Sequence, residues 1–272
     1  MRYGIEVVPF GQFGNPKIVV KFARAAEAAG WEGIWVWDHL LFPYGVGDPW
    51  IILSAVATST QSLKIVTGIS PLPRYPLHVL ARMITSLDIL SGGRVIFGTG
   101  LGIDHEFTQV GESGNPAIRA SMLDEGLDIL TTLWSGTPVT HHGTHYTLSD
   151  VTCLPSPVQT PLPIWIGGES KAALRRAARW NGWIIGTINE KCEIIRSPEK
   201  LEQEIRYTHS YRKNNDAFDV AIDGVSIPGE SDNPLIHAYE QAGATWWFES
   251  IFGLRGSEKE MLERIQAGPP QG

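Results

Sequence analysis

The feature that most constrains the fold is a regular alternation of short β-rich runs with longer amphipathic runs. The β-rich runs predict strands at 3–8, 33–37, 63–69, 94–98, 163–167, 182–187, 218–227 and 245–250. The amphipathic runs predict helices at 16–29, 49–60, 76–90, 116–134, 170–180, 198–213, 233–242 and 257–266. Such alternation indicates βαβ units and a parallel sheet. Eight repeats favour an α/β fold closed as a (β/α)8 TIM barrel, with a doubly wound open sheet as the alternative.

One segment interrupts the alternation. Residues 138–162 contain several prolines, a His142-Gly143 turn and two short β-rich runs, which together predict a small hairpin. This excursion would be an insertion between the fourth helix and the fifth strand. A chain of 272 residues fits one barrel of ordinary size, so we expect a single domain over residues 1–272.

Composition and charge exclude several classes of protein. Hydrophobic residues make up 43% of the chain, enough for a large core, and the net charge of −7 argues against a nucleic-acid partner. Glu6 stands where a signal peptide would need an apolar run, and no apolar stretch reaches about 18 residues. The two cysteines, Cys153 and Cys192, do not make a disulfide scaffold. We therefore expect a cytoplasmic protein with no membrane partner.

In a TIM barrel the chemistry lies on the loops that follow the strands. The second predicted strand is followed by Asp38 and His39. A carboxylate beside an imidazole suits proton transfer, because histidine titrates near neutral pH. The alternative is a loop in which Asp38 only caps the local backbone.

The third predicted strand runs into a stiff segment with three prolines. This segment contains Thr67, Gly68, Ile69 and Ser70, and Gly68 would let a neighbouring group approach the backbone closely. A plain proline-rich loop is the alternative.

The fourth predicted strand ends in the glycine-rich sequence Gly98-Thr99-Gly100-Leu101-Gly102. The spacing departs from the G-x-G-x-x-G of dinucleotide-binding sites, and the unit is not the first of the chain. What remains is a bare strand end over which a flat ring could lie. Residues 104–107 add titratable groups there, or else form a solvated loop.

The fifth predicted strand ends in Gly167 and Gly168, and a helix is expected to begin at Ser170. Glycines before a helix N-terminus expose backbone N–H groups, which favours an anion such as phosphate. Positive side chains follow at Lys171, Arg175 and Arg176. An ordinary tight turn is the alternative.

Three histidines, His141, His142 and His145, lie in the excursion. No cysteine or acidic cluster with metal-ligand spacing accompanies them, so a polar hairpin is the expected structure and no metal site is predicted.

An ordered series of short motifs resembles the bacterial luciferase-like monooxygenase superfamily, and within it the F420-dependent and flavin-dependent oxidoreductases. The motifs are Trp37-Asp38-His39-Leu40, Leu87-Asp88-Ile89-Leu90-Ser91-Gly92-Gly93-Arg94, Gly98-Thr99-Gly100, Leu133-Trp134-Ser135-Gly136, Pro155-x-Pro157-Val158-Gln159 and Pro163-Ile164-Trp165-Ile166-Gly167-Gly168-Glu169-Ser170. They span roughly residues 1–187 in family order, and the last third matches only in its βα rhythm.

The resemblance implies a barrel with an insertion, a homodimer, and a cofactor at the C-terminal mouth. The cofactor would be coenzyme F420, or alternatively FMN. Asp38 and His39 match the pair that F420-dependent members place near the reactive ring. The peptide between Gly68 and Ile69 falls where such enzymes carry a bulge with a non-prolyl cis bond.

Two further strand ends of this sequence match motifs of the family. Gly98, Thr99 and Gly100 match a ring-lining strand end, and Gly167 and Gly168 match a phosphate contact. Residues 100–103 lack the acid-Asn pattern of the family's sugar-phosphate dehydrogenases, which counts against a sugar-phosphate substrate.

The resulting hypothesis is an F420-dependent oxidoreductase that transfers a hydride between the deazaflavin and a small organic molecule. His39, oriented by Asp38, would exchange the proton beside the hydride site. The alternatives are an FMN-dependent monooxygenase that uses O2, a non-catalytic ligand-binding barrel, and a metal-dependent hydrolase, which the missing ligand spacings disfavour. Residues 42–50, residues 105–115 and the region near Trp246 and Trp247 would form the pocket for an apolar or planar substrate.

Overall fold

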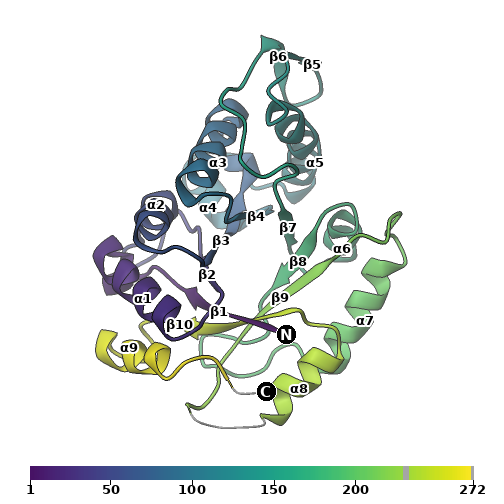
Figure 1. Cartoon of the computed structure of the whole chain (residues 1–272). Coiled ribbons are helices and arrows are strands. Elements are labelled where there is room, and N and C mark those ends of the chain that lie inside the picture. The colour runs from purple at the N-terminus through teal and green to yellow at the C-terminus, as the bar shows by residue number, and fades with distance from the viewer. Residues whose placement is uncertain (229–232, 271–272) are drawn as a thin grey trace.

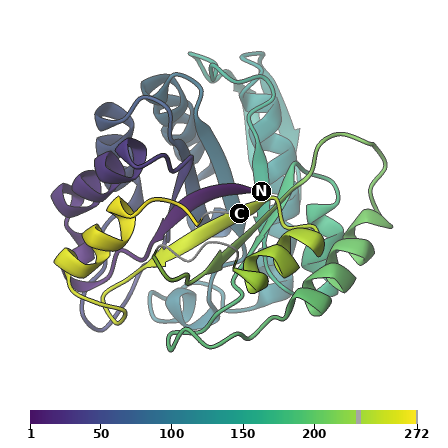
Figure 2. The same cartoon turned by 60° about the horizontal axis from the view of Figure 1, so that its bottom comes forward.

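The computed structural model describes residues 1–228 and 233–270. Within this part of the chain, the strands β1 (Arg2–Val7), β2 (Gly33–Val36), β3 (Lys64–Pro71), β4 (Val95–Gly100), β7 (Ile164–Gly167), β8 (Gly182–Ile185), β9 (Asp219–Gly224) and β10 (Trp246–Ile251) form a closed parallel barrel. They follow one another around the barrel in chain order, and β10 pairs with β1 to close it. Figure 2 shows these two strands, yellow and purple, side by side. The predicted barrel is confirmed, and the open sheet is wrong.

Helices cover the outside of the barrel (Figure 1). They are α1 (Pro16–Ala28), α2 (Pro49–Ser59), α3 (Leu77–Ser91), α5 (Pro116–Leu133), α6 (Lys171–Ala177), α7 (Pro198–His209), α8 (Pro234–Gln241) and α9 (Glu258–Gln266). The short helix α4 (Asp104–Thr108) lies beyond the C-terminal end of β2, where Glu106 contacts residues 39–41. Their ends follow signals in the sequence. Asn15 and Asp48 cap α1 and α2, each with proline at the next position, and Gly92 ends α3 in the left-handed conformation.

The excursion is a two-stranded antiparallel hairpin of β5 (Val139–His142) and β6 (Thr147–Val151). It lies between α5 and β7 in the chain, as predicted, and stands at the top of Figure 1 beyond the barrel. His141 Nε2 lies 3.0 Å from Glu125 Oε1, so this histidine attaches the hairpin to α5.

Several elements differ from the sequence-based expectation. The strand β3 continues to Pro71 and β4 to Gly100, and their pairing resumes at Ser70 and Thr99 after an irregularity that begins at Thr67. Short 3-10 helices, η1 (Gly11–Gly14) and η2 (Leu72–Arg74), and the helix α4 occupy segments expected to be loops. The helices α6 and α7 end earlier than their amphipathic runs suggested.

Large aromatic side chains fill the interior of the barrel. Trp165, Trp246 and Phe248 belong to one buried cluster, and glycines opposite them leave the space that these rings need. A Cβ atom at Gly4 would lie 2.4 Å from the Phe248 ring, and one at Gly182 would lie 2.4 Å from the Trp165 ring. The interior is therefore a packed core, and a ligand site has to lie at an end of the barrel.

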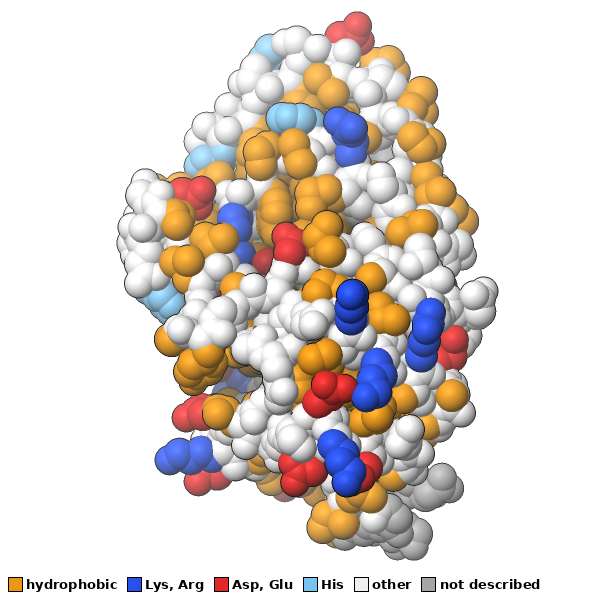
Figure 3. Space-filling model, turned by 90° about the vertical axis from the view of Figure 1, so that its left-hand side faces the viewer, with side chains coloured by type: hydrophobic (Ala, Val, Ile, Leu, Met, Phe, Trp, Pro, Cys, Tyr) orange, Lys and Arg blue, Asp and Glu red, His pale blue; other side chains and the backbone are white. Residues whose placement is uncertain are grey.

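The surface shown in Figure 3 carries charged side chains of both signs, interspersed mainly in its lower half, with hydrophobic side chains gathered above them. In the described part of the chain, no helix has the length and apolar character needed to cross a bilayer.

Candidate active site

The C-terminal ends of the strands form a mouth whose two halves differ in chemistry. On one side the ends of β3, β4 and β7 bring together Ile69, Gly98, Gly100 and Gly167, which we call the glycine ledge. On the other side the ends of β1, β9 and β10 border a cavity that contains carboxylates and aromatic rings.

The glycine ledge is shaped by close backbone approaches. The peptide between Gly68 and Ile69 is cis, as the family resemblance implied. A Cβ atom at Gly167 would lie 1.8 Å from Ile69 Cδ1, and one at Gly100 would lie 2.9 Å from Ile69 Cγ2. Any larger residue at these two strand ends would collide with the Ile69 side chain, so both positions require glycine. The predicted ring-lining residues therefore do come together in space.

The two threonine hydroxyls predicted at the ledge form hydrogen bonds with the backbone. The Thr67 hydroxyl donates to the Gly98 carbonyl at 3.0 Å and accepts the Gly98 N–H at 3.0 Å. The Thr99 hydroxyl donates to the Ser70 carbonyl at 2.8 Å. The buried Thr67 and Thr99 hydroxyls thus fix the register of β3 and β4 beneath the ledge, and buried Ser70 contributes its backbone carbonyl.

The predicted anion site lies at the start of α6. Gly168 has a φ of 118°, which favours glycine, and its carbonyl accepts the Trp183 Nε1–H at 2.9 Å. The Ser170 hydroxyl accepts the Ala173 N–H at 3.1 Å and so caps α6 itself.

The positive charges expected near this turn lie elsewhere. Arg176 pairs with Asp124 of α5 at 2.7 Å, and Arg175 donates to the Tyr207 hydroxyl at 2.7 Å. The arginine that approaches the turn is Arg196, which lies 2.9 Å from Glu169. The cationic side chains do lie on α6, as predicted. Arg175 and Arg176, however, point toward neighbouring helices and not toward the glycine turn.

His39 is held at the mouth by a carboxylate from α4. Its Nδ1 lies 2.9 Å from Glu106 Oε1, and its ring packs against Trp37 and Phe10 at centroid distances of 5.4 and 5.3 Å. Glu106 also accepts the N–H groups of Leu40 and Leu41. In the described part of the chain, His39 Nε2 has no hydrogen-bond partner, so this nitrogen is available to a ligand.

Asp38 does not orient His39, and that part of the hypothesis is wrong. The Asp38 carboxylate accepts the Tyr75 hydroxyl at 2.8 Å and lies 3.3 Å from Arg74 Nη1. Arg74 also lies 2.6 Å from Glu106 and so connects the two carboxylates. The side chains of Asp38 and His39 diverge because successive residues of an extended segment point in opposite directions.

The charges in this network determine its protonation. Burial would raise the pKa of Glu106, but the hydrogen bond and charge of His39, together with Arg74, hold that pKa below its ordinary value. Burial raises the pKa of Asp38, and its hydrogen bonds and Arg74 oppose that shift only in part. A carboxylate at Glu106 is thus well placed to stabilise a protonated His39.

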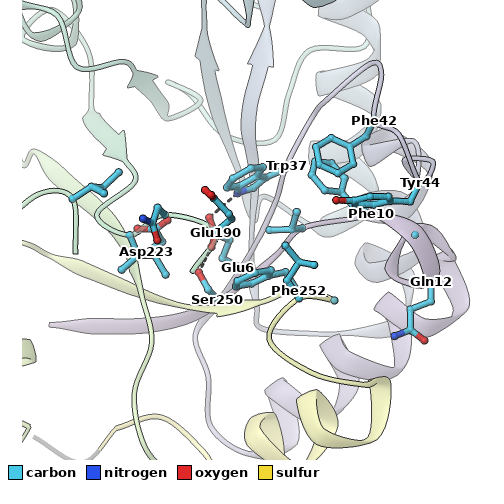
Figure 4. Close-up of a pocket in the computed structure, with 17 residues that line it drawn as sticks. Glu6, Phe10, Gln12, Trp37, Phe42, Tyr44, Glu190, Asp223, Ser250 and Phe252 are labelled. Carbon is cyan, nitrogen blue, oxygen red and sulfur yellow. Dashed lines mark hydrogen bonds between the residues drawn. The ribbon is translucent and has the colours of Figure 1, made fainter. Parts of the chain in front are cut away.

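The cavity beside the ledge has a volume of about 770 Å³, and we call it the acidic cavity (Figure 4). Its lining residues are Glu6, Val8, Phe10, Gly11, Gln12, Trp37, Phe42, Tyr44, Ile188, Asn189, Glu190, Ile195, Asp223, Ser250, Phe252, Gly253 and Leu254. Phe10 and Phe42 are stacked at a centroid distance of 3.6 Å, and Tyr44 meets Phe42 edge-on.

Some of the segments expected to form a substrate pocket line the acidic cavity. Phe42 and Tyr44, from residues 42–50, line the acidic cavity. Residues 105–115 do not line it, and Trp246 and Trp247 are 0% and 1% exposed in the packed interior. The two tryptophans belong to the core, whereas Ser250 and residues 252–254, just after them in the chain, line the cavity.

Two buried acids lie at the base of the acidic cavity. Glu6 Oε1 accepts the Trp37 Nε1–H at 2.6 Å, and its other oxygen accepts the Ser250 hydroxyl. Asp223 accepts the backbone N–H of Thr187. Burial and the nearby Asp223 raise the pKa of Glu6 well above its ordinary value, and burial raises the pKa of Asp223 to about 6.

No role was predicted for Glu6, Asp223 or Arg74, and Glu106 was expected only as one of the titratable groups of residues 104–107. A signal was present for the first two, because each interrupts an otherwise apolar strand run close to its C-terminal end. A charged residue in that position of a barrel strand points to the mouth. Glu106 and Arg74 come from α4 and η2, which periodicity did not predict.

A model of the luciferase-like monooxygenase family matches residues 7–259. The chain is 34% identical over 209 residues to an F420-dependent glucose-6-phosphate dehydrogenase from Microbacterium testaceum, covering 74% of this chain and 60% of that protein. It is 31% identical over 186 residues to an F420-dependent hydroxymycolic acid dehydrogenase from Mycobacterium tuberculosis, covering 65% of this chain and 51% of that protein. The matched region thus spans about half to three fifths of these named relatives.

The fold is also similar to a solved structure. The F420-dependent tetrahydromethanopterin reductase from Methanopyrus kandleri superposes with a TM-score of 0.77 at 17% identity, covering 97% of each chain. This likeness concerns the fold alone.

Proposed function

The chain belongs to the luciferase-like monooxygenase family, and on that premise we propose that it is an F420-dependent oxidoreductase acting on a small organic molecule. The observation that carries the proposal is the position of His39, held by Glu106, at the end of β2 beside the glycine ledge of β3. The ledge itself offers no redox-active side chain. The electron carrier would therefore be a bound cofactor, with the protein supplying position and proton transfer.

The glycine ledge fits a flat ring. The distances from Ile69 to hypothetical Cβ atoms at Gly100 and Gly167 indicate that any side chain there would displace Ile69. Ile69 and the strand end from Gly98 to Gly100 would support the ring, and Gly168 with the start of α6 would hold the phosphate. When bound, F420 supplies a ring carbon that accepts or donates a hydride.

His39 would move the proton. Its Nδ1 is occupied by Glu106, which leaves Nε2 to exchange a proton with the substrate. Glu106 fixes the tautomer and ring orientation and stabilises the positive charge that forms on protonation. Arg74 pairs with Glu106 as well, and Arg74 is in turn paired with Asp38, which accepts the Tyr75 hydroxyl.

The choice of F420 over FMN is supported by the named relatives, which are F420-dependent dehydrogenases at 31% and 34% identity. An FMN-dependent monooxygenase that uses O2 is the second candidate, favoured by the family description. A non-catalytic barrel is the third, and the His39–Glu106 pair counts against it.

Titration of the purified protein with F420 and, separately, with FMN tests the proposal through ligand fluorescence. We expect F420 to bind at least about tenfold more tightly than FMN. Tighter binding of FMN, with oxygen uptake during turnover, would transfer the assignment to the monooxygenase. If neither cofactor binds, the non-catalytic ligand-binding barrel becomes the better hypothesis.

The homodimer also stays a proposal. Apolar side chains exposed on α2 and α3, among them Ile51 at 61% and Leu90 at 46%, offer a surface that a second copy could cover. Light scattering on the purified protein tests it, and a monomer mass at working concentration would contradict it.

A further inference from the structure

Two carboxyl groups in the acidic cavity are buried without a positive partner. Glu6 is 1% exposed and Asp223 is 3% exposed. Their hydrogen-bond donors, Trp37, Ser250 and the backbone of Thr187, are all neutral. Neither acid forms an ion pair within the described part of the chain. Keeping two such groups ionised in one cavity is costly unless a cation lies beside them. Without a cation, burial favours the protonated, neutral form.

Other buried carboxylates near the mouth are paired with arginine. Glu106 lies 2.6 Å from Arg74, and Glu249, on the same strand as Ser250, lies 2.6 Å from Arg255 and 3.2 Å from Arg264. The missing countercharge is therefore particular to the acidic cavity and is not a general property of this part of the fold.

The raised pKa values agree with this geometry. Burial and the charge of Asp223 raise the pKa of Glu6, and burial raises the pKa of Asp223. Both shifts have the sign expected for carboxyl groups that lack a cation nearby.

The remaining walls of the acidic cavity suit an apolar body. Phe10, Phe42 and Tyr44 form a connected aromatic wall, and Phe252 and Leu254 line the cavity as well. Aromatic faces attract organic cations as well as apolar groups. No lysine, arginine or histidine occurs among the described residues that line the cavity. A phosphate or carboxylate substrate would find no positive side chain there.

We propose that the acidic cavity binds an apolar amine in its protonated form, with the ammonium group at Glu6 and Asp223 and the apolar body against the wall of Phe10, Phe42 and Tyr44. This deepens the proposed function and rests on it in one respect, since the amine would be the substrate of the oxidoreductase. Binding itself needs only the cavity. The proposal sets this chain apart from relatives named for a sugar-phosphate substrate.

The test compares three probes that share one apolar body and differ in charge: 4-phenylbutylamine, 4-phenylbutanol and 4-phenylbutanoate. Each is titrated by calorimetry into the full chain at pH 8 with no cofactor added. We expect the amine to bind about tenfold more tightly than the alcohol and the carboxylate to bind most weakly. Equal binding of amine and alcohol, tightest binding of the carboxylate, or no binding of any probe would overturn the proposal.

Variants then locate the charge. Asp223→Asn and Glu6→Gln should each reduce the preference for amine over alcohol to about twofold while alcohol binding is kept. The matched control is Asp219→Asn, which makes the same change at the other end of β9, outside the cavity, and should keep the full preference. If both cavity variants keep the full preference for amine over alcohol, the ammonium group does not bind at Glu6 and Asp223. The comparison of probes on the unaltered protein decides the proposal even if a variant does not fold.

The same preparation is titrated with F420 so that the two proposals can fail separately. Amine binding without F420 binding would overturn the cofactor assignment only. F420 binding without a preference for the amine would overturn the substrate class only.

Discussion

On the side of β3, β4 and β7 the barrel mouth is built from backbone, whereas on the side of β1, β9 and β10 it is built from side chains. The glycine ledge has no room for a side chain at Gly167, because a Cβ atom there would collide with Ile69. The acidic cavity instead presents Glu6, Asp223 and aromatic rings around a volume of about 770 Å³. This contrast underlies our two proposals, in which a large flat cofactor lies on the glycine ledge and a small cation binds in the acidic cavity.

His39 lies between the two halves, and its replacement tests whether proton transfer can be lost while cofactor binding is kept. Replacing it with alanine should lower kcat by about 1,000-fold, because the proton-exchanging group is lost. The affinity for F420 should change by less than about threefold, since the ledge is untouched. Stopped-flow turnover and fluorescence titration measure the two quantities. Equal losses in both would contradict the acid–base role, and His39→Gln should be as inactive as His39→Ala.

The glycine ledge can be broken without touching the acidic cavity. Gly167→Ala should weaken F420 binding by about 100-fold, because the new methyl group displaces Ile69 toward the place of the ring. Binding of 4-phenylbutylamine should stay within about twofold. Adding Ile69→Ala should restore part of the F420 affinity by relieving the collision. If both ligands lose affinity together, the two halves are not separate sites.

The buried Asp223 of the acidic cavity should make the free energy of unfolding depend on pH. The pKa of Asp223 is raised to about 6 by burial, so between about pH 4 and pH 6 the folded chain holds a proton that the unfolded chain has released. Stability therefore falls as the pH rises through this window. Asp223→Asn should remove a fall of about 2 kcal/mol in the free energy of unfolding, measured in urea at pH 4 and pH 7. Asp219→Asn should keep the pH dependence of the unaltered chain, and an equal flattening there would argue against the assignment.

The smallest effect is expected at the support of His39. Glu106→Gln keeps the shape of the side chain and removes its charge, so kcat should fall by about tenfold. The affinity for F420 should change by less than about threefold, because Glu106 contacts His39 and not the glycine ledge. Glu112→Gln, an exposed change just beyond α4, is the matched control. An equal loss of F420 affinity would indicate a merely structural role.

Much of the fold could be predicted because the relevant signals are local. Alternating apolar runs, the Asn15 and Asp48 caps and the Gly92 stop are each visible within a few residues of sequence. Closure into a barrel followed from the number of repeats. The bulge near Gly68 and Ile69 was expected only from the family resemblance, since no local propensity specifies it.

The side-chain contacts of the site could not be predicted in the same way. The partner of His39 is Glu106, which lies 67 residues away in the chain and comes from a helix of five residues too short to show periodicity. Asp38 looked like the partner because it is adjacent in sequence, yet it faces Arg74 and Tyr75. The meeting of Glu6 with Asp223 depends on barrel closure, which no local pattern reports.

The measurement that tests the division of the mouth most directly is titration of 4-phenylbutylamine into the protein with and without saturating F420. If the glycine ledge and the acidic cavity are neighbouring sites, the amine should bind the F420-loaded protein at least as tightly as the free protein, with one amine per chain. If F420 instead weakens amine binding in proportion to its own concentration, the two ligands compete for one site and the account is contradicted.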